Sequence, residues 1–208
     1  MPASSAPYHS AVSQLTSTGA PFEIVDSVRN GTAMKAYKNA AQNLLVVVNE
    51  GRQFGNAPFV TYEDKTHSFA DFFDQVDRLR STLINHQHIQ KGDKIAIAMR
   101  NCPEWMVAFV AILGCGAVAV PLNSWGREEE LSQGLDDSEA KLVICDWPRY
   151  QFIESKLPNV SAIVVEPKGE CAPGASLWQL DESANNSAPE VASNPEDPAI
   201  MLFTSGTS

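Results

Sequence analysis

From about residue 58 onward, the sequence alternates short apolar runs with amphipathic stretches, and this pattern limits the possible folds more than any other feature. The runs 95–99, 142–145 and 162–165 are short and apolar throughout, which is typical of strands buried on both faces of a sheet. The stretches between them are long enough to form helices. We therefore expect an α/β fold with a largely parallel sheet and flanking helices.

The intervening stretches carry helical signals. Apolar residues in the range 69–84 recur at spacings of three and four, and Ser68 followed by Asp71 suits the start of a helix. Pro103 suits the first position of a helix that ends before Gly116. Further helices are predicted over 127–135 and 149–156.

The remaining segments are less regular. Residues 1–20 are rich in Pro, Ser and Thr and are expected to form a mobile tail, followed by one domain over 21–208. Within that domain we predict a helix over 32–49. Pro, Gly, Ser, Asn and acidic residues dominate 167–197, which we interpret as a connector, and 199–203 is predicted to be a strand.

The charge balance argues against nucleic-acid and membrane-surface partners. The 208 residues contain 15 Lys and Arg against 25 Asp and Glu, so the formal net charge is −10. Signal and transit peptides need basic residues, and the first 28 residues contain no Lys or Arg. We therefore expect a cytoplasmic protein. The four cysteines form no CxxC pair, so reduced thiols are expected rather than disulfides or a metal site.

The charge-free stretch Trp105–Leu122 allows a second interpretation, a membrane span. Gly114 and Gly116 interrupt it, and Pro121 lies near its end. It divides naturally into a helix and a buried strand, so we expect no membrane span.

Five residues at the end of the sequence have the chemistry of a phosphate cradle. Ser, Thr and Gly supply hydroxyls, a flexible backbone and N–H groups that can converge on an anion. Ser, Thr and Gly are also common in ordinary terminal tails, which is the alternative. The candidate phosphate-binding residues are Thr204, Ser205, Gly206, Thr207 and Ser208.

Other polar residues are weaker candidates. His86 and His88 follow a predicted helix, and Asp136, Asp137 and Glu139 end another, so we interpret both groups as solvated surface. No catalytic residue and no metal ligand is predicted among them.

Two segments resemble a known family. Residues 199–208, AIMLFTSGTS, resemble the first half of the phosphate-loop motif of the adenylate-forming superfamily, the AMP-dependent synthetases and ligases. Residues 91–146 resemble the N-terminal subdomain of acyl-CoA synthetases, including the KGD turn at 91–93 and Asn-x-Pro-Glu-Trp at 101–105. The resemblance covers about residues 25–208, and fatty-acid CoA ligases are the most similar branch.

The resemblance implies an acid–thiol ligase. Residues Thr204–Ser208 would bind the β- and γ-phosphates of ATP with Mg²⁺, a carboxylic acid would become an acyl-adenylate, and coenzyme A would then accept the acyl group. The family's phosphate loop continues with Gly, Pro and Lys, and its adenine, metal and acyl sites lie further along. We therefore expect an N-terminal portion of a larger enzyme that is inactive alone. The alternative is a non-catalytic α/β module that pairs with a full-length relative, and the sequence leaves the oligomeric state open.

Overall fold

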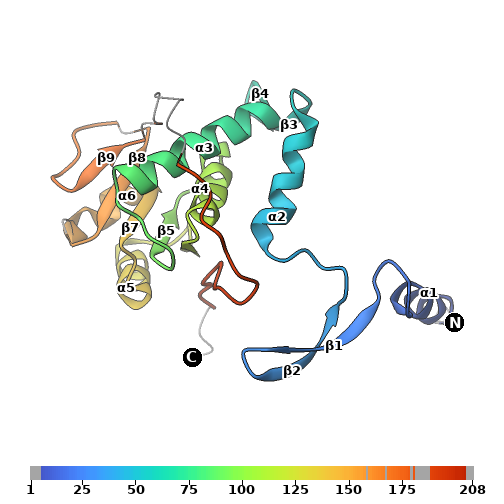
Figure 1. Ribbon diagram of the computed structural model, residues 1–208. Helices are drawn as coiled ribbons and strands as arrows, with labels where there is room; N and C mark the ends of the chain where they lie inside the picture. The colour runs from blue at the N-terminus through green and yellow to red at the C-terminus, as the bar shows by residue number, and fades with distance from the viewer. Residues whose placement is uncertain (1–5, 158, 167, 179, 181–187, 205–208) are drawn as a thin grey trace, which may run out of the picture. The chain divides into compact units, whose positions relative to one another are not determined.

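The computed structural model describes residues 6–157, 159–166, 168–178, 180 and 188–204. The chain forms two compact units. The first comprises residues 1–43 with 194–196, and the second comprises residues 44–193 with 197–208. Figure 1 shows the chain, with labels on most of its helices and strands.

The first unit contains a helix and a hairpin: α1 (Ala6–Thr16), β1 (Ile24–Arg29) and β2 (Thr32–Tyr37). Helix α1 lies inside the range 1–20, whose mobility stays a prediction. The predicted helix over 32–49 is wrong in its first half, because β1 and β2 pair antiparallel with Arg29 opposite Thr32. Asn30 and Gly31 make the two-residue turn with φ of 48° and 76°, as a tight hairpin turn requires.

The second unit begins with short helices and a hairpin that lead into a long amphipathic helix. Ser68 and Asp71 form the predicted capping box at the start of this helix, with the Ser68 hydroxyl accepting the Asp71 amide. The elements are α2 (Leu44–Asn49), the 3₁₀ helix η1 (Glu50–Phe54), β3 (Pro58–Tyr62), β4 (Lys65–Ser68) and α3 (Phe69–Asn85).

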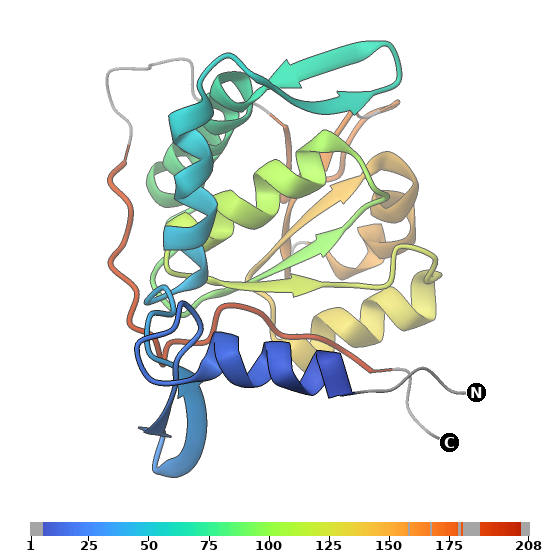
Figure 2. The same cartoon turned by 90° about the vertical axis from the view of Figure 1, so that its right-hand side faces the viewer.

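A five-stranded parallel sheet forms the centre of this unit, in the order β6-β5-β7-β8-β9, and confirms the predicted α/β class (Figure 2). Its elements are β5 (Lys94–Ala98), α4 (Pro103–Gly114), β6 (Val118–Pro121), α5 (Glu128–Ser138), β7 (Leu142–Asp146), α6 (Trp147–Ile153), the 3₁₀ helix η2 (Glu154–Lys156), β8 (Ser161–Val165) and β9 (Ala175–Leu177). Each predicted helix and strand in 94–165 is present within a few residues.

The two faces of the sheet support separate apolar cores. Ile95 and Ile97 of β5 belong to the core shared with α3 and α4, whereas the alternate residues Ala96 and Ala98 belong to the core shared with α5 and α6. This division follows from the two-residue repeat of a strand. Both faces are covered, which explains why the strand sequences are apolar throughout.

Strand β9 lies inside the predicted connector 167–197 and was not expected. It pairs parallel with β8, and the Trp178 amide donates to the Val164 carbonyl at 2.8 Å. Trp105–Leu122 divides into α4 and β6 as predicted. Among the described residues, no helix is long and apolar enough to cross a bilayer.

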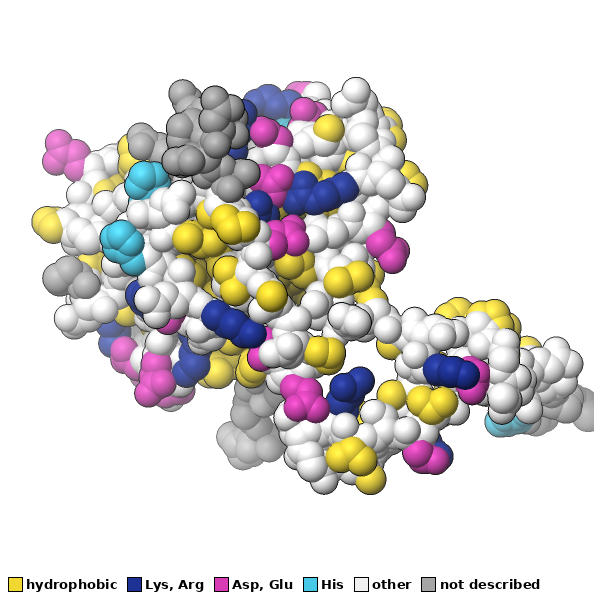
Figure 3. Space-filling view, in the orientation of Figure 1, with side chains coloured by type: hydrophobic (Ala, Val, Ile, Leu, Met, Phe, Trp, Pro, Cys, Tyr) yellow, Lys and Arg dark blue, Asp and Glu magenta, His cyan; other side chains and the backbone are white. Residues whose placement is uncertain are grey.

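Charged side chains gather where α2, η1 and α3 meet. Arg52 and Arg80 both contact the Asp77 carboxylate at 2.7 Å. Figure 3 shows Lys or Arg side chains beside Asp or Glu side chains near α2 and α3. These pairs connect the first elements of the second unit to one another.

Candidate functional site

The chain returns to the sheet next to β6 just before the predicted phosphate loop. Ile200 forms a parallel bridge with Ala119 of β6. The Ala119 amide donates to the Ala199 carbonyl at 3.0 Å, and the Met201 amide donates to the Ala119 carbonyl at 2.9 Å. The predicted strand 199–203 is therefore present only as this bridge.

Thr204 follows this bridge and lies beyond the carboxyl end of β6. Because the bridge is parallel, both segments leave the sheet at the same edge. In open parallel sheets, ligands bind outside the carboxyl ends of the strands. The first predicted phosphate-binding residue thus reaches the edge where a ligand is expected.

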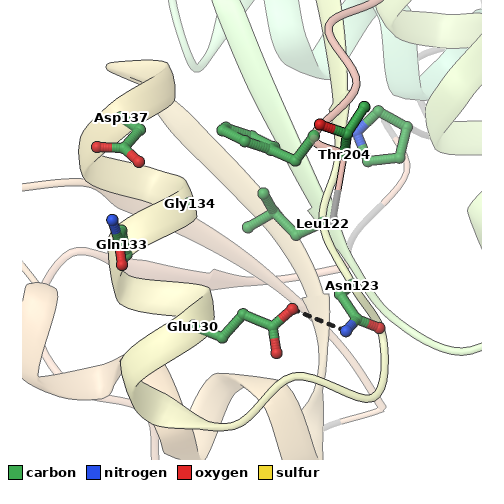
Figure 4. Close-up of a pocket in the computed structure, with 9 residues that line it drawn as sticks. Leu122, Asn123, Glu130, Gln133, Gly134, Asp137 and Thr204 are labelled. Atoms are coloured by element: carbon green, nitrogen blue, oxygen red, sulfur yellow. Dashed lines mark hydrogen bonds between the residues drawn. The ribbon is translucent and has the colours of Figure 1, made fainter. Parts of the chain in front are cut away.

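A pocket of about 650 Å³ separates Thr204 from helix α5. Figure 4 shows Glu130, Gln133 and Asp137 on α5, with Leu122 and Thr204 opposite them. Pro121, Leu122 and Phe203 provide apolar lining, and Asn123, Glu130, Gln133, Gly134, Asp137 and Thr204 complete it.

Helix α5 packs closely against Leu122, the residue that follows β6, at the position of Gly134. A Cβ atom at Gly134 would lie 2.9 Å from Cδ2 of Leu122, well inside van der Waals contact. Asn123 in turn donates to the Glu130 carboxylate at 2.8 Å and connects the loop after β6 to the same helix. These contacts hold the walls of the pocket together.

The pocket carries two carboxylates opposite one hydroxyl. Glu130 and Asp137 are exposed, and no Lys or Arg occurs among the described lining residues. The two carboxylates would repel a bare phosphate, and a divalent cation bound to the phosphate would reduce that repulsion. The described part of the site therefore fits a metal-complexed polyphosphate better than a free anion.

The structure places one of the five predicted phosphate-binding residues, Thr204, which is exposed at the pocket. Ser205, Gly206, Thr207 and Ser208 lie outside the described residues. Their assignment as phosphate ligands stays a prediction.

Sequence reasoning missed a second polar group at the carboxyl edge of the sheet. The Arg100 guanidinium lies 3.1 Å from the centre of the exposed Trp125 ring. The Asp146 carboxylate accepts the Arg100 amide at 3.0 Å and also binds Arg149, whose guanidinium donates to the Ser124 carbonyl. No motif indicates this group, because its members come from the ends of β5, β6 and β7.

The remaining candidate residues lie outside the pocket that Thr204 lines. His86 and His88 are exposed at the end of α3, as predicted. Burial raises the pKa of the Cys102 thiol, near the end of β5, to about 12, so it stays protonated at neutral pH. Within the described ranges, no three His, Cys, Asp or Glu side chains are placed to hold a metal ion.

Comparison with known proteins identifies similar sequences. The family model described as AMP-binding enzyme matches residues 48–208, which begins inside the second unit. The chain is 30% identical over 143 residues to an oxalate–CoA ligase of Arabidopsis thaliana, covering 66% of this chain and 27% of the relative. It is 33% identical over 135 residues to a probable CoA ligase of Humulus lupulus, covering 64% and 26%.

A solved structure has the same fold. An anthranilate CoA ligase in complex with anthranoyl-AMP aligns with a TM-score of 0.68 at 21% identity. The alignment covers 81% of this chain and 33% of that protein. The present sequence thus spans about a quarter to a third of the proteins that it matches.

Proposed function

This chain belongs to the family of AMP-binding enzymes, and we propose that it forms the N-terminal part of an ATP-dependent acid–thiol ligase. The fold agrees with that of the N-terminal subdomains of adenylate-forming enzymes. The curated relatives at 30% and 33% identity are both named as CoA ligases.

The proposed reaction has two steps. A substrate carboxylate attacks the α-phosphorus of ATP, forms an acyl-adenylate and releases pyrophosphate. The thiol of coenzyme A then attacks the acyl carbon and releases AMP, leaving a thioester. In such transfers the protein contributes positioning and stabilisation of charge.

One observation carries the assignment of this chain's role. The segment before Thr204 runs parallel to β6 and brings Thr204, the first residue of the Ser/Thr/Gly sequence, to the carboxyl edge of the sheet. We propose that the backbone N–H groups and hydroxyls of residues 204–208 hold the β- and γ-phosphates of ATP. Glu130 and Asp137 would help to hold the Mg²⁺ that accompanies ATP, since proteins usually bind Mg²⁺ through one or two carboxylates together with the substrate phosphates.

The acid is proposed from the sequence resemblance alone, which indicates a fatty acid. The relatives named above are associated with oxalate and anthranilate, so these acids are the comparison substrates for any assay. We also propose a cytoplasmic location.

We further propose that the 208-residue chain does not complete the reaction alone. It spans only about a quarter of the length of its curated relatives. We propose that its described residues supply one wall of the nucleotide site. Release of pyrophosphate by this chain with ATP and any of the three acids would contradict this proposal.

Nucleotide binding can be tested directly on the chain by titration with MgATP, followed by backbone NMR. We expect the signals of Met201 and Thr204 to shift with MgATP and with magnesium pyrophosphate. MgAMP lacks the β- and γ-phosphates and is expected to shift them much less. Equal shifts with MgAMP would contradict the phosphate assignment.

A pair of threonine substitutions makes the test specific. Thr204→Val removes the hydroxyl at the pocket and is expected to weaken MgATP binding. Thr32→Val makes the same change at an exposed threonine in the first unit and serves as the control. Equal effects of both substitutions would argue against a role for Thr204.

A further inference from the structure

Lysine 91 connects two segments that precede the proposed phosphate loop. Its ammonium group donates to the Ala192 carbonyl at 3.1 Å and contacts the Asp197 carboxylate at 2.6 Å. The Lys91 side chain thereby joins Ala192 and Asp197, which are five positions apart in the sequence, to the turn that precedes β5.

The position of Lys91 is itself fixed by the sheet. The amide of the following residue, Gly92, donates to the Gly116 carbonyl at 2.9 Å, next to the start of β6. A Cβ atom at Gly116 would lie 3.3 Å from Cγ of Lys91 and 3.0 Å from Cγ1 of Val191. The glycine, whose φ is +64°, leaves space for both side chains.

The chain upstream of Ala192 is held independently. Arg80, which is 5% exposed, donates from Nε to the Ala188 carbonyl at 2.9 Å, and the Ser81 hydroxyl accepts the Ala188 amide at 2.9 Å. The Val191 amide donates to the Gly114 carbonyl at 2.9 Å. Residues 188–192 therefore have a fixed path along the ends of α3 and α4.

Downstream of Asp197, the chain soon reaches the bridge with β6. Ala199 and Met201 make their hydrogen bonds to Ala119, and Thr204 follows. Between the Lys91 contact at Asp197 and this bridge there is only Pro198, whose fixed φ limits the freedom of the connection. The position of Asp197 thus restricts where the strand begins.

We propose that Lys91 is a positioning residue, which holds Asp197 and Ala192 so that residues 199–201 pair with β6 and deliver Thr204 to the pocket. The expected effect of Lys91 on nucleotide binding rests on the proposed function. The positioning itself depends only on the contacts described above.

The unfolding midpoint distinguishes a positioning role for Lys91 from a general contribution to the stability of the fold. Lys91 and Asp197 have side-chain exposures of 39% and 28%, and ion pairs near the surface contribute little to overall stability. We therefore expect Lys91→Met to leave the unfolding midpoint nearly unchanged. Its effect should instead appear locally, at the bridge.

The test is amide hydrogen exchange on the whole chain, read at Ala119 and Met201, whose amides form the bridge. Lys91→Met is expected to accelerate exchange at both amides about two- to fivefold. The amides of Ile97 and Ile144, in the centre of the sheet, should exchange at the wild-type rate. Lys91→Arg keeps the charge and should restore slow exchange.

Lys94→Met is the matched control. Lys94 is also near β6, and its ammonium contacts Glu139 at 3.1 Å, away from residues 188–201. Unchanged exchange at Ala119 and Met201 in Lys91→Met would overturn the proposal, as would equal acceleration in Lys94→Met. Failure of Lys91→Arg to restore slow exchange would also overturn it.

Titration of the same variants with MgATP separates the two proposals. If wild type binds MgATP and Lys91→Met binds it more weakly, both proposals are supported. If wild type shows no response at Thr204, the proposed function is contradicted, and the exchange rates still decide the role of Lys91.

Discussion

The Met201 amide donates a 2.9 Å hydrogen bond to the carbonyl of Ala119, and this bond joins the final described segment to the edge of the sheet. The contact joins residues far apart in the sequence. It brings the residue that starts the proposed phosphate loop next to β6.

Met201→Pro tests the bridge, because proline has no N–H to donate to Ala119. We expect the Ala119 amide to exchange faster and the Thr204 NMR signal to sharpen. Leu202→Pro is the control, since its amide makes no hydrogen bond that the described structure records. Similar exchange at Ala119 in both variants would contradict the importance of this bond.

Substitution of two helical glycines by alanine tests whether the neighbouring side chains can make room for a Cβ atom. A Cβ at Gly114 would lie 2.9 Å from Cδ of Arg80, whose guanidinium is fixed by hydrogen bonds. Gly114→Ala should therefore lower the free energy of unfolding by about 1–3 kcal/mol.

Gly134→Ala creates a contact of the same length, but with the end of the Leu122 side chain, which can rotate away. We expect a smaller loss, partly offset by the higher helix propensity of alanine. Urea unfolding of both variants measures the difference, and a larger loss for Gly134→Ala would contradict this account.

Acid should weaken the charge network on α3. Burial opposes ionisation of Asp77, but hydrogen bonds and charge from Arg52, with a further contribution from Arg80, outweigh it and lower the pKa of Asp77. Because the folded protein then binds the proton less readily than the unfolded chain, Asp77 stabilises the fold above about pH 4. That stabilisation is lost as the pH falls through the folded-state pKa.

Urea midpoints measured between pH 6 and pH 3 test this prediction. Asp77→Asn should lose stability at pH 6 and show a weaker dependence on pH than wild type. Glu190, 3.6 Å from Arg80, also faces this network and is unchanged in that variant. Asp74→Asn, which alters the separate pair with Arg78, should retain the wild-type dependence.

Two buried thiols, Cys115 and Cys145, and the partly buried thiol of Cys102 should react slowly in the folded protein. Burial raises the pKa of Cys102 and of Cys115 to about 12 and also raises that of Cys145. At pH 8 we expect an aromatic disulfide reagent to modify these three thiols far more slowly in native protein than in urea. Cys171→Ala removes the fourth, partly exposed thiol from the measurement. Fast modification of the folded Cys171→Ala variant by the reagent would contradict the burial of the three remaining thiols.

The hairpin β1–β2 was predictable from the sequence but was not predicted. Asn-Gly between strands is a strong local hairpin signal, and residues 30–31 contain it. The helix predicted over 32–49 joins the strand β2 to the apolar run at 44–48, and only that run is helical, in α2. The error shows that turn chemistry, read at Asn30 and Gly31, outweighs a general helical pattern.

Strand β9 and the polar group around Arg100 had no comparable signal. Residues 175–177 form a strand only because β8 offers them partners. Arg100, Trp125 and Asp146 meet because three strand ends share one edge. Such contacts depend on strand order, which local periodicity does not encode.

The sequence by itself determined the α/β class, the helices and strands of residues 69–165, and the Ser/Thr/Gly segment that resembles a phosphate loop. These features depend on residues close together in the chain, so periodicity, capping and turn residues are enough to predict them. Only the tertiary structure decided that residues 199–201 pair with β6, that Thr204 faces Glu130 and Asp137 across a pocket, and that Lys91 ties the preceding chain in place. Those relationships depend on hydrogen bonds and packing between distant residues, which exist only once the sheet has assembled.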